Sequence, residues 1–147
     1  MNIHEFKAII QLIPFDQLVT TVKVNNNLRG QGIETSIHER LEALGRKHFR
    51  IPMAQQDPFF FQEFVAMAEY HEKSPTTFVL DFMNGCDKEL KEHLLQLIYN
   101  RQHNGFKLPD TARTILIFGE EQKSGEIYTN PKIDDYWILH GFNVTVE

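Results

Sequence analysis

The clearest signal for the fold lies in residues 78–119, which read FVLDFMNGCDKELKEHLLQLIYNRQHNGFKLPDTARTILIFG. Apolar runs over 76–82 and 112–119 predict two buried strands of a parallel sheet, and the first of them ends in an acid. Residues 86–102 predict a helix between these strands, with Asp87 early in its first turn. The apolar side chains of this helix form one stripe: Leu90, Leu94, Leu97 and Ile98. Two such strands joined through a helix are typical of a βαβ unit.

The rest of the chain continues this alternation. Further helices are predicted over 3–13, 33–44 and 58–71, and further strands over 18–25, 48–53 and 142–147. Residues 104–110 are interpreted as a loop, and Gly45 as the residue that follows the end of a helix. We therefore expect a three-layer α/β fold, in which helices cover both faces of a parallel sheet. Residues 1–147 contain no repeat or linker composition and are predicted to form one domain.

The charge balance of the chain is acidic. It carries 20 acidic and 15 basic residues, for a formal net charge of −5. A strongly electrostatic nucleic-acid surface needs a basic face, so this class of protein is disfavoured. Arg46, Lys47 and Arg50 lie close together and suggest a local basic patch, but we favour a solvated helix end and strand edge.

Metal, disulfide and membrane signals are weak. Cys86 is the single cysteine, and the 7 histidines are scattered along the sequence, so no metal site is predicted. No apolar run approaches the length of a membrane span. The first residues lack the basic region and cleavage site of a signal peptide, and we expect a cytoplasmic protein.

Residues 78–119 resemble the core of a AAA+ ATPase of the MoxR group. In that family an apolar strand ending in Asp-Glu is followed by Asn-x-x-Asp, a helix of the type LLQLI-x-x-R, a loop of the type G-x-x-LP-[DE] and a second apolar strand. Residues 29–55 are similar to the family's phosphate-loop region, and 129–147 to the stretch before its last core strand. The resemblance implies a P-loop NTPase sheet in the order 5-1-4-3-2. It also implies a core without the family's helical lid, because the sequence ends at Glu147.

The position-by-position resemblance predicts a degenerate Walker A loop. Such a loop needs glycines that let backbone N–H groups approach phosphates, a Lys for the β/γ-phosphates and a Ser or Thr for Mg²⁺. Gly32 and Ser36 fit this pattern, whereas Thr35 stands at the Lys position and Glu34 at the preceding Gly. Arg29 replaces the first Gly. We expect this loop to hold no nucleotide and to depart from a phosphate-cradling shape, because Arg29 and Glu34 lack glycine's freedom at positive φ. Ser36 or Thr35 is expected near a helix cap instead.

The remaining catalytic positions also depart from the family pattern. Asp81 stands at the Walker B aspartate, but Phe82 replaces the following carboxylate that activates water. The sensor-1 position falls near Glu120 and the arginine-finger position at Tyr136. An alternative role for Asp81 is to cap a loop. We therefore predict no catalysis, no cofactor and a degenerate nucleotide site.

Three functions remain open at this stage. The first is a non-catalytic protein-interaction or assembly module, which binds a AAA+ ring, a larger assembly or itself. The second is a regulatory module that binds nucleotide without hydrolysing it, with Ser36 and Asp81 as the remaining Mg²⁺ ligands. The third, a nucleic-acid accessory protein, is disfavoured by the acidic balance. A further alternative is a small α/β protein whose resemblance to AAA+ ATPases is coincidental. A strand order other than 5-1-4-3-2 would support this alternative.

The predicted interaction surface lies at the carboxyl ends of the strands. Phe82, Met83, Glu120 and Glu121 are placed there, and an exposed apolar group beside acids suits a protein partner. The alternative for Phe82 is that its ring turns inward and fills the pocket.

Overall fold

The computed structural model describes residues 1–25, 28, 30–119 and 141–146, the backbone alone for 141–145. In this part of the chain, five parallel strands form one sheet in the order β2-β3-β6-β1-β7. The strands are β1 (Val19–Val24), β2 (Lys47–Pro52), β3 (Thr76–Asp81), β6 (Ala112–Gly119) and β7 (Gly141–Val146). Numbered along the chain without the hairpin β4-β5, this order is 5-1-4-3-2. The predicted sheet is confirmed, and each strand lies within about one residue of its predicted range.

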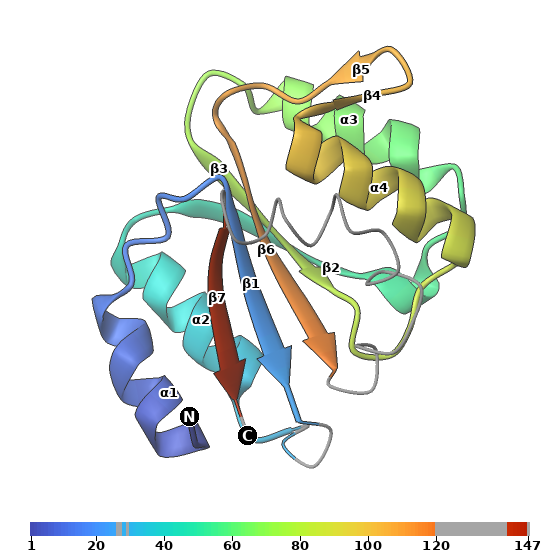
Figure 1. Ribbon diagram of the computed structural model, residues 1–147. Helices are drawn as coiled ribbons and strands as arrows, with labels where there is room; N and C mark the ends of the chain where they lie inside the picture. The colour runs from blue at the N-terminus through green and yellow to red at the C-terminus, as the bar shows by residue number, and fades with distance from the viewer. Residues whose placement is uncertain (26–27, 29, 120–140, 147) are drawn as a thin grey trace.

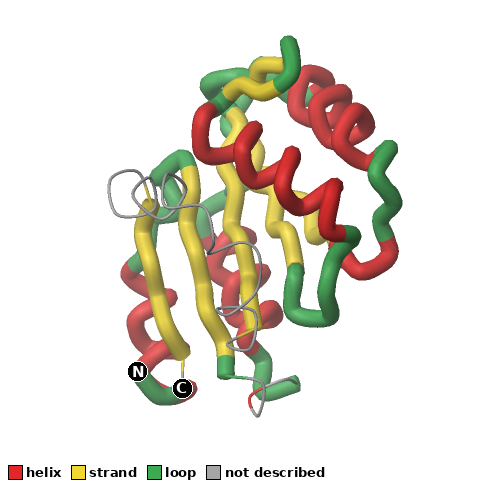
Figure 2. Tube along the Cα trace, turned by 45° about the vertical axis from the view of Figure 1, so that its right-hand side comes forward, coloured by secondary structure: helices red, strands yellow, loops and turns green. Residues whose placement is uncertain are grey.

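Helices cover both faces of the sheet (Figures 1 and 2). They are α1 (Ile3–Ile9), α2 (Ile33–Ala43), α3 (Phe60–Tyr70) and α4 (Lys88–Asn100). Two short 3₁₀ turns, Ile10–Leu12 and Met53–Gln55, follow α1 and β2. None of the helices in the described ranges has the length and apolar composition that a bilayer crossing requires.

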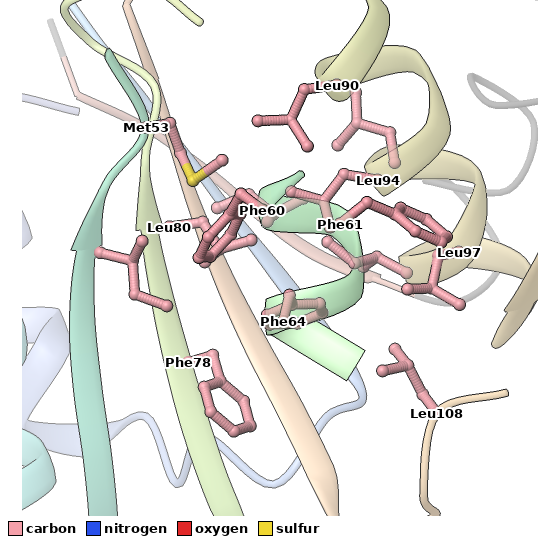
Figure 3. Packing of buried hydrophobic residues seen from close by; sticks show 14 of the residues in the cluster. Met53, Phe60, Phe61, Phe64, Phe78, Leu80, Leu90, Leu94, Leu97 and Leu108 are labelled. Carbon is pink, nitrogen blue, oxygen red and sulfur yellow. The ribbon is translucent and has the colours of Figure 1, made fainter. Parts of the chain in front are cut away.

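The two helical layers enclose separate hydrophobic clusters. Side chains of α1 and α2 pack with Val22, Ile115 and Ile117 on one face of the sheet. Side chains of α3 and α4 pack with Phe78, Leu80 and other residues on the opposite face (Figure 3). Because side chains alternate along a strand, β3 and β6 contribute to both clusters. The sheet is therefore buried on both sides, as its continuous apolar strands predict.

Capping interactions set the ends of two helices. The carboxylate of Asp87 accepts the N–H of Leu90 at 3.0 Å, so Asp87 is the N-cap of α4 and not a residue of its first turn. Gly45 follows α2 at a φ of +65°, and its N–H donates to the carbonyl of Glu42. The N–H of Arg46 donates to Leu41, which completes a Schellman motif. The predicted role of Gly45 is confirmed.

The segment 104–110 differs from its prediction as a loop. The strands β4 (Gln102–His103) and β5 (Phe106–Lys107) form an antiparallel hairpin. Asn104 and Gly105 join these strands with φ angles of +51° and +82°, the left-handed conformations of a type I′ turn. An Asn-Gly pair is the strongest short hairpin signal, but strands of two residues are too short to show a period.

Candidate functional site

The candidate site lies where the chain leaves β1 and enters α2, at the carboxyl end of the sheet. Ligands of open α/β sheets bind at this edge. A cleft of about 320 Å³ opens there, and its lining includes Gly32, Glu34, Thr35, Arg50 and Asp81. The structure therefore brings together four of the positions predicted for a degenerate nucleotide site, and it adds Arg50 from β2.

Two glycines shape the loop before α2. Gly30 and Gly32 have φ angles of +77° and +91°, which side chains disfavour. Gly32 is the N-cap of α2, and its carbonyl oxygen accepts the hydroxyl of buried Ser36 at 2.8 Å. Ser36 is thus in the first turns of the helix, with its hydroxyl bonded back to the loop. The predicted effect of Arg29 on the loop falls on a residue outside the described part of the chain.

Arg50 joins two carboxylates in the cleft. Its Nε donates to Glu34 Oε2 at 2.6 Å, and its Nη2 donates to Asp81 Oδ2 at 3.2 Å. The side chain of Asp81 is 7% exposed, and its Oδ1 accepts the N–H of Met83 at 2.9 Å. Asp81 therefore has the loop-capping role that was its predicted alternative, together with an ion pair to a neighbouring strand. We call Glu34, Arg50 and Asp81 the ion-pair cluster.

Burial changes the acidity of Glu34. Desolvation and a hydrogen bond to Asp81 raise the pKa of Glu34 to about 7, although Arg50 acts to lower it. The hydrogen bond from Arg50 to Glu34 raises the pKa of the guanidinium, so Arg50 is a cation at neutral pH. Two neighbouring acids ionise together only at a cost. Glu34 therefore exchanges a proton near neutral pH.

The charges and hydrogen bonds of the ion-pair cluster disfavour a magnesium nucleotide. Mg²⁺ binds through carboxylate oxygens, water and phosphate oxygens, but Asp81 Oδ2 already accepts a bond from a guanidinium. A divalent cation there would be repelled by Arg50, and a polyphosphate would meet Glu34. Thr35, at the Walker A lysine position, brings no positive charge.

Phe82 is buried, which corrects its placement on an exposed interaction surface. Its side chain is 0% exposed, and its ring stacks on Phe118 with centroids 4.9 Å apart. Asp81 and Phe82 are consecutive, so they point to opposite faces of the sheet. The ring turns inward, as the alternative prediction stated, but it enters the cluster beneath α3 and α4 and does not fill the cleft.

The other predicted surface positions have different outcomes. Met83 is half-buried and lines the cleft. Glu120, Glu121 and Tyr136 lie outside the described residues, so their roles stay predictions.

The contacts of Arg50 and of the pair His38 and His48 were not predicted from the sequence. Arg50 was expected at a solvated edge, and the histidines were considered scattered. In the structure His38 Nδ1 and His48 Nε2 are 2.8 Å apart. The alternation of side chains along β2 could have indicated these contacts. His48 and Arg50 point to the α2 side, whereas Phe49 and Ile51 pack with the opposite cluster.

Cys86 does not form a nucleophilic site. Burial raises the pKa of the Cys86 thiol to about 11, so the thiolate is scarce at neutral pH. A second histidine pair lies by the hairpin, where His93 Nδ1 and His103 Nε2 are 2.8 Å apart. Burial and His93 lower the pKa of His103, which favours the neutral form of this imidazole beside the ring of Phe61.

Comparison with known proteins supports the fold alone. No protein-family model matches the sequence, and no curated protein matches it significantly. Solved structures with a similar fold include Rif2 of Saccharomyces cerevisiae, with 9% identity, a TM-score of 0.59 and coverage of 99% of this chain. A RuvB mutant of Thermotoga maritima has 10% identity, a TM-score of 0.56 and 97% coverage. NtrX of Brucella abortus, solved in complex with ADP, has 9% identity, a TM-score of 0.59 and 97% coverage.

The chain spans 55%, 44% and 35% of the lengths of these three chains. Their similarity extends over nearly all of this chain and includes its parallel sheet. The chain therefore has an α/β fold of the AAA+ and P-loop NTPase kind.

Proposed function

We propose that this chain is a non-catalytic protein-interaction or assembly module built on a degenerate AAA+ core. The observation that supports the proposal is the ion-pair cluster. Arg50 forms ion pairs with both Glu34 and Asp81 within the cleft that the resemblance assigns to nucleotide. The acids that would face metal and phosphate are thus paired internally. The closer likeness of residues 78–119 to the MoxR group belongs to the same proposal.

Phe82 supports the same proposal. A water-activating carboxylate must face the bound phosphate, whereas position 82 faces a buried aromatic ring on the other side of the sheet. The framework of strands and helices is intact, and folding does not require the catalytic groups. The chain keeps the shape of a AAA+ core and lacks the means to hydrolyse ATP.

Exposed aromatic side chains support a proposed surface for a protein partner. Phe59 and Tyr70, at the two ends of α3, are 73% and 84% exposed, and Phe106 of the hairpin is 37% exposed. Phe106 also contacts the ring of Phe61 on α3, with centroids 5.4 Å apart. Aromatic side chains are enriched at protein interfaces. With Phe82 buried, we place the contact surface over α3 and β4-β5, with Phe59, Tyr70 and Phe106 as its anchors.

The absence of catalysis is tested with purified protein and Mg²⁺-ATP. We expect no hydrolysis above the rate without protein, and neither heat in calorimetry nor a rise in Tm. Hydrolysis that disappears in Asp81→Ala would overturn the proposal. Heat and a Tm rise that require Asp81, without hydrolysis, would instead support the regulatory nucleotide-binding module, for which the cleft of about 320 Å³ is large enough. Asp16→Ala, an exposed acid away from the cleft, is the matched control.

The interaction surface is tested by quantitative partner capture from the native host and by sedimentation velocity. The double variant Phe59→Ser/Tyr70→Ser is expected to fold normally and to lose either a captured partner or self-association. Leu12→Ser changes a side chain that is 79% exposed on the opposite side of the sheet, and it is expected to retain both. If the two variants behave alike, the surface over α3 is not the binding site.

A further inference from the structure

A cluster of possible metal ligands lies outside the candidate nucleotide cleft. His38 and Glu42 are one turn apart on α2, and His48 is the second residue of β2. His48 Nε2 lies 2.8 Å from His38 Nδ1 and 3.8 Å from Glu42 Oε1. His38 Nε2 lies 3.9 Å from the same carboxylate oxygen. One possible ligand atom from each of the three residues lies within 4.8 Å of those of the other two.

A short, well-ordered connection holds these groups together. The Schellman motif at Gly45 ends α2 and returns the chain to β2 within a few residues. The guanidinium of Arg46 donates to the carbonyls of Phe15 and Pro14 at 2.6 and 3.3 Å. The backbone between the helix and the strand is therefore fixed on both sides, and the positions of the ligands do not depend on a long loop.

His48 is oriented as a metal-binding histidine is. Its Nδ1 lies 2.9 Å from the carbonyl oxygen of Arg46, and because a carbonyl can only accept, Nδ1 carries the proton. The lone pair is then on Nε2, which points at His38 and Glu42. An N–H bond from the second ring nitrogen to a carbonyl is the usual outer-shell support of a metal ligand. The side chain of His48 is 9% exposed, whereas His38 and Glu42 are 62% and 64% exposed and can adjust.

The geometry points to a binding site for a divalent transition-metal ion of the Zn²⁺ class at His38, Glu42 and His48. Two imidazoles and one carboxylate are a ligand set of open zinc sites, with a fourth position for water. Bonds of about 2.0–2.1 Å in a tetrahedron place donor atoms about 3.3–3.4 Å apart. The two separations that share His48 Nε2, 2.8 Å to His38 Nδ1 and 3.8 Å to Glu42 Oε1, lie on both sides of that value. Binding requires a small opening of the histidine pair and a closer approach of Glu42.

The site adjoins a second groove, of about 420 Å³, between α2 and β2. His38, His48 and Arg50 are among its lining residues. A metal ion held by the two histidines lies at the wall of this groove, so its water position is accessible from solvent. The site is separate from the proposed interaction surface over α3, and neither proposal depends on the other.

The test is isothermal titration of untagged wild-type protein with ZnCl₂ at neutral pH. We expect one ion per chain. Removal of an outer-shell partner commonly weakens metal binding by about 10–100-fold, so loss of a ligand in His48→Ala or His38→Ala should weaken it by at least about tenfold. Glu42→Gln should weaken it less. Because His38 and Glu42 are exposed, their variants are expected to fold even if His48→Ala does not.

Two controls separate this site from ordinary surface histidines. His4→Ala removes an exposed imidazole of α1. His93→Ala breaks the other histidine pair, which has the same 2.8 Å spacing. Both are expected to bind Zn²⁺ as the wild type does, and imidazole ¹⁵N spectra are expected to show the largest zinc-induced shift at His48 Nε2. No stoichiometric binding by the wild type, or binding that survives His38→Ala and Glu42→Gln but fails in His93→Ala, would overturn the site.

Discussion

Asp81 and Phe82 are consecutive residues whose side chains point to opposite faces of one sheet. Asp81 turns toward α2, where Arg50 and the N–H of Met83 satisfy its carboxylate. Phe82 turns toward α3 and α4, where it stacks on Phe118. The alternation of side chains along a strand therefore separates a polar residue that lines the cleft from an apolar residue that packs in the core.

Phe82→Ala is expected to lower the free energy of unfolding by about 3–5 kcal/mol, because it removes a fully buried ring and leaves a cavity. Urea unfolding followed by circular dichroism measures this loss. The matched control is Phe59→Ala, which truncates a side chain that is 73% exposed and should change the free energy by less than about 0.5 kcal/mol. Wild-type stability of Phe82→Ala together with lost partner binding would show that the ring is a contact residue after all.

Glu34 makes stability depend on pH in a defined direction. Its pKa is raised from 4.5 to about 7, so the folded state binds more protons than the unfolded state between these values. The contribution of Glu34 to stability is fully present below about pH 4.5 and is lost as the pH rises through about 7. In Glu34→Gln this loss is absent, so Tm measured from pH 4.5 to 8 should fall less steeply than for the wild type. Glu39→Gln, an exposed acid of the same helix, should follow the wild-type curve, and identical curves for all three proteins would contradict the shift.

At the scale of elements, the two ends of α2 position both proposed sites, the cleft and the histidine pair. Gly32 begins α2 at the cleft, and Gly45 ends it beside the histidine pair. The same helix thus contributes Glu34 to one site and His38 to the other. After the buried strand β3 ends at Asp81, the chain turns and reaches Asp87, the N-cap of α4.

Asp87→Ala is expected to destabilise the protein by about 1 kcal/mol, because the N–H of Leu90 loses its acceptor at the start of α4. Thermal unfolding measures the change. Asp87→Ser keeps a capping oxygen and is expected to recover most of the loss. An equal loss in both variants would mean that the carboxylate charge, and not the cap, stabilises the helix.

The long elements were predictable because their periods are regular and their ends carry capping signals. The hairpin β4-β5 was missed since each strand has two residues, although Asn104–Gly105 marks its turn. The ion-pair cluster was missed for a different reason. Glu34, Arg50 and Asp81 come from α2, β2 and β3, and their contact depends on the register that places Pro52 beside Asp81. The inward turn of Phe82 was available from strand alternation, and the sequence interpretation left both orientations open.

At the scale of the whole molecule, the two hydrophobic clusters share one sheet. Val79 and Ile115 belong to the cluster under α1 and α2, whereas Leu80 and Leu116 on the same strands belong to the cluster under α3 and α4. Neither helical layer can detach from the sheet or unfold without exposing one apolar face of these strands to solvent. The described core is therefore expected to unfold as one cooperative unit.

Leu41→Ala and Leu94→Ala test this coupling, since each truncates a 0% exposed leucine in a different cluster. Each variant is expected to lose about 2–5 kcal/mol and still to unfold in one transition. Calorimetry gives the measurement, because calorimetric and van't Hoff enthalpies agree for a single transition. Leu12→Ala, which changes a 79% exposed leucine, should leave both values unchanged. Two resolved transitions in either core variant would show that the layers unfold separately.

The stack of Phe82 on Phe118 limits what a substitution at position 82 can achieve. The resemblance to the MoxR group assigns a water-activating carboxylate to this position, and Phe82→Glu would place one in an apolar cluster. The loss of the ring alone costs about 3–5 kcal/mol, a large part of the roughly 5–15 kcal/mol by which domains are stable. On the proposed function, a carboxylate placed at position 82 by a single substitution is therefore expected to destabilise the domain before it could support hydrolysis.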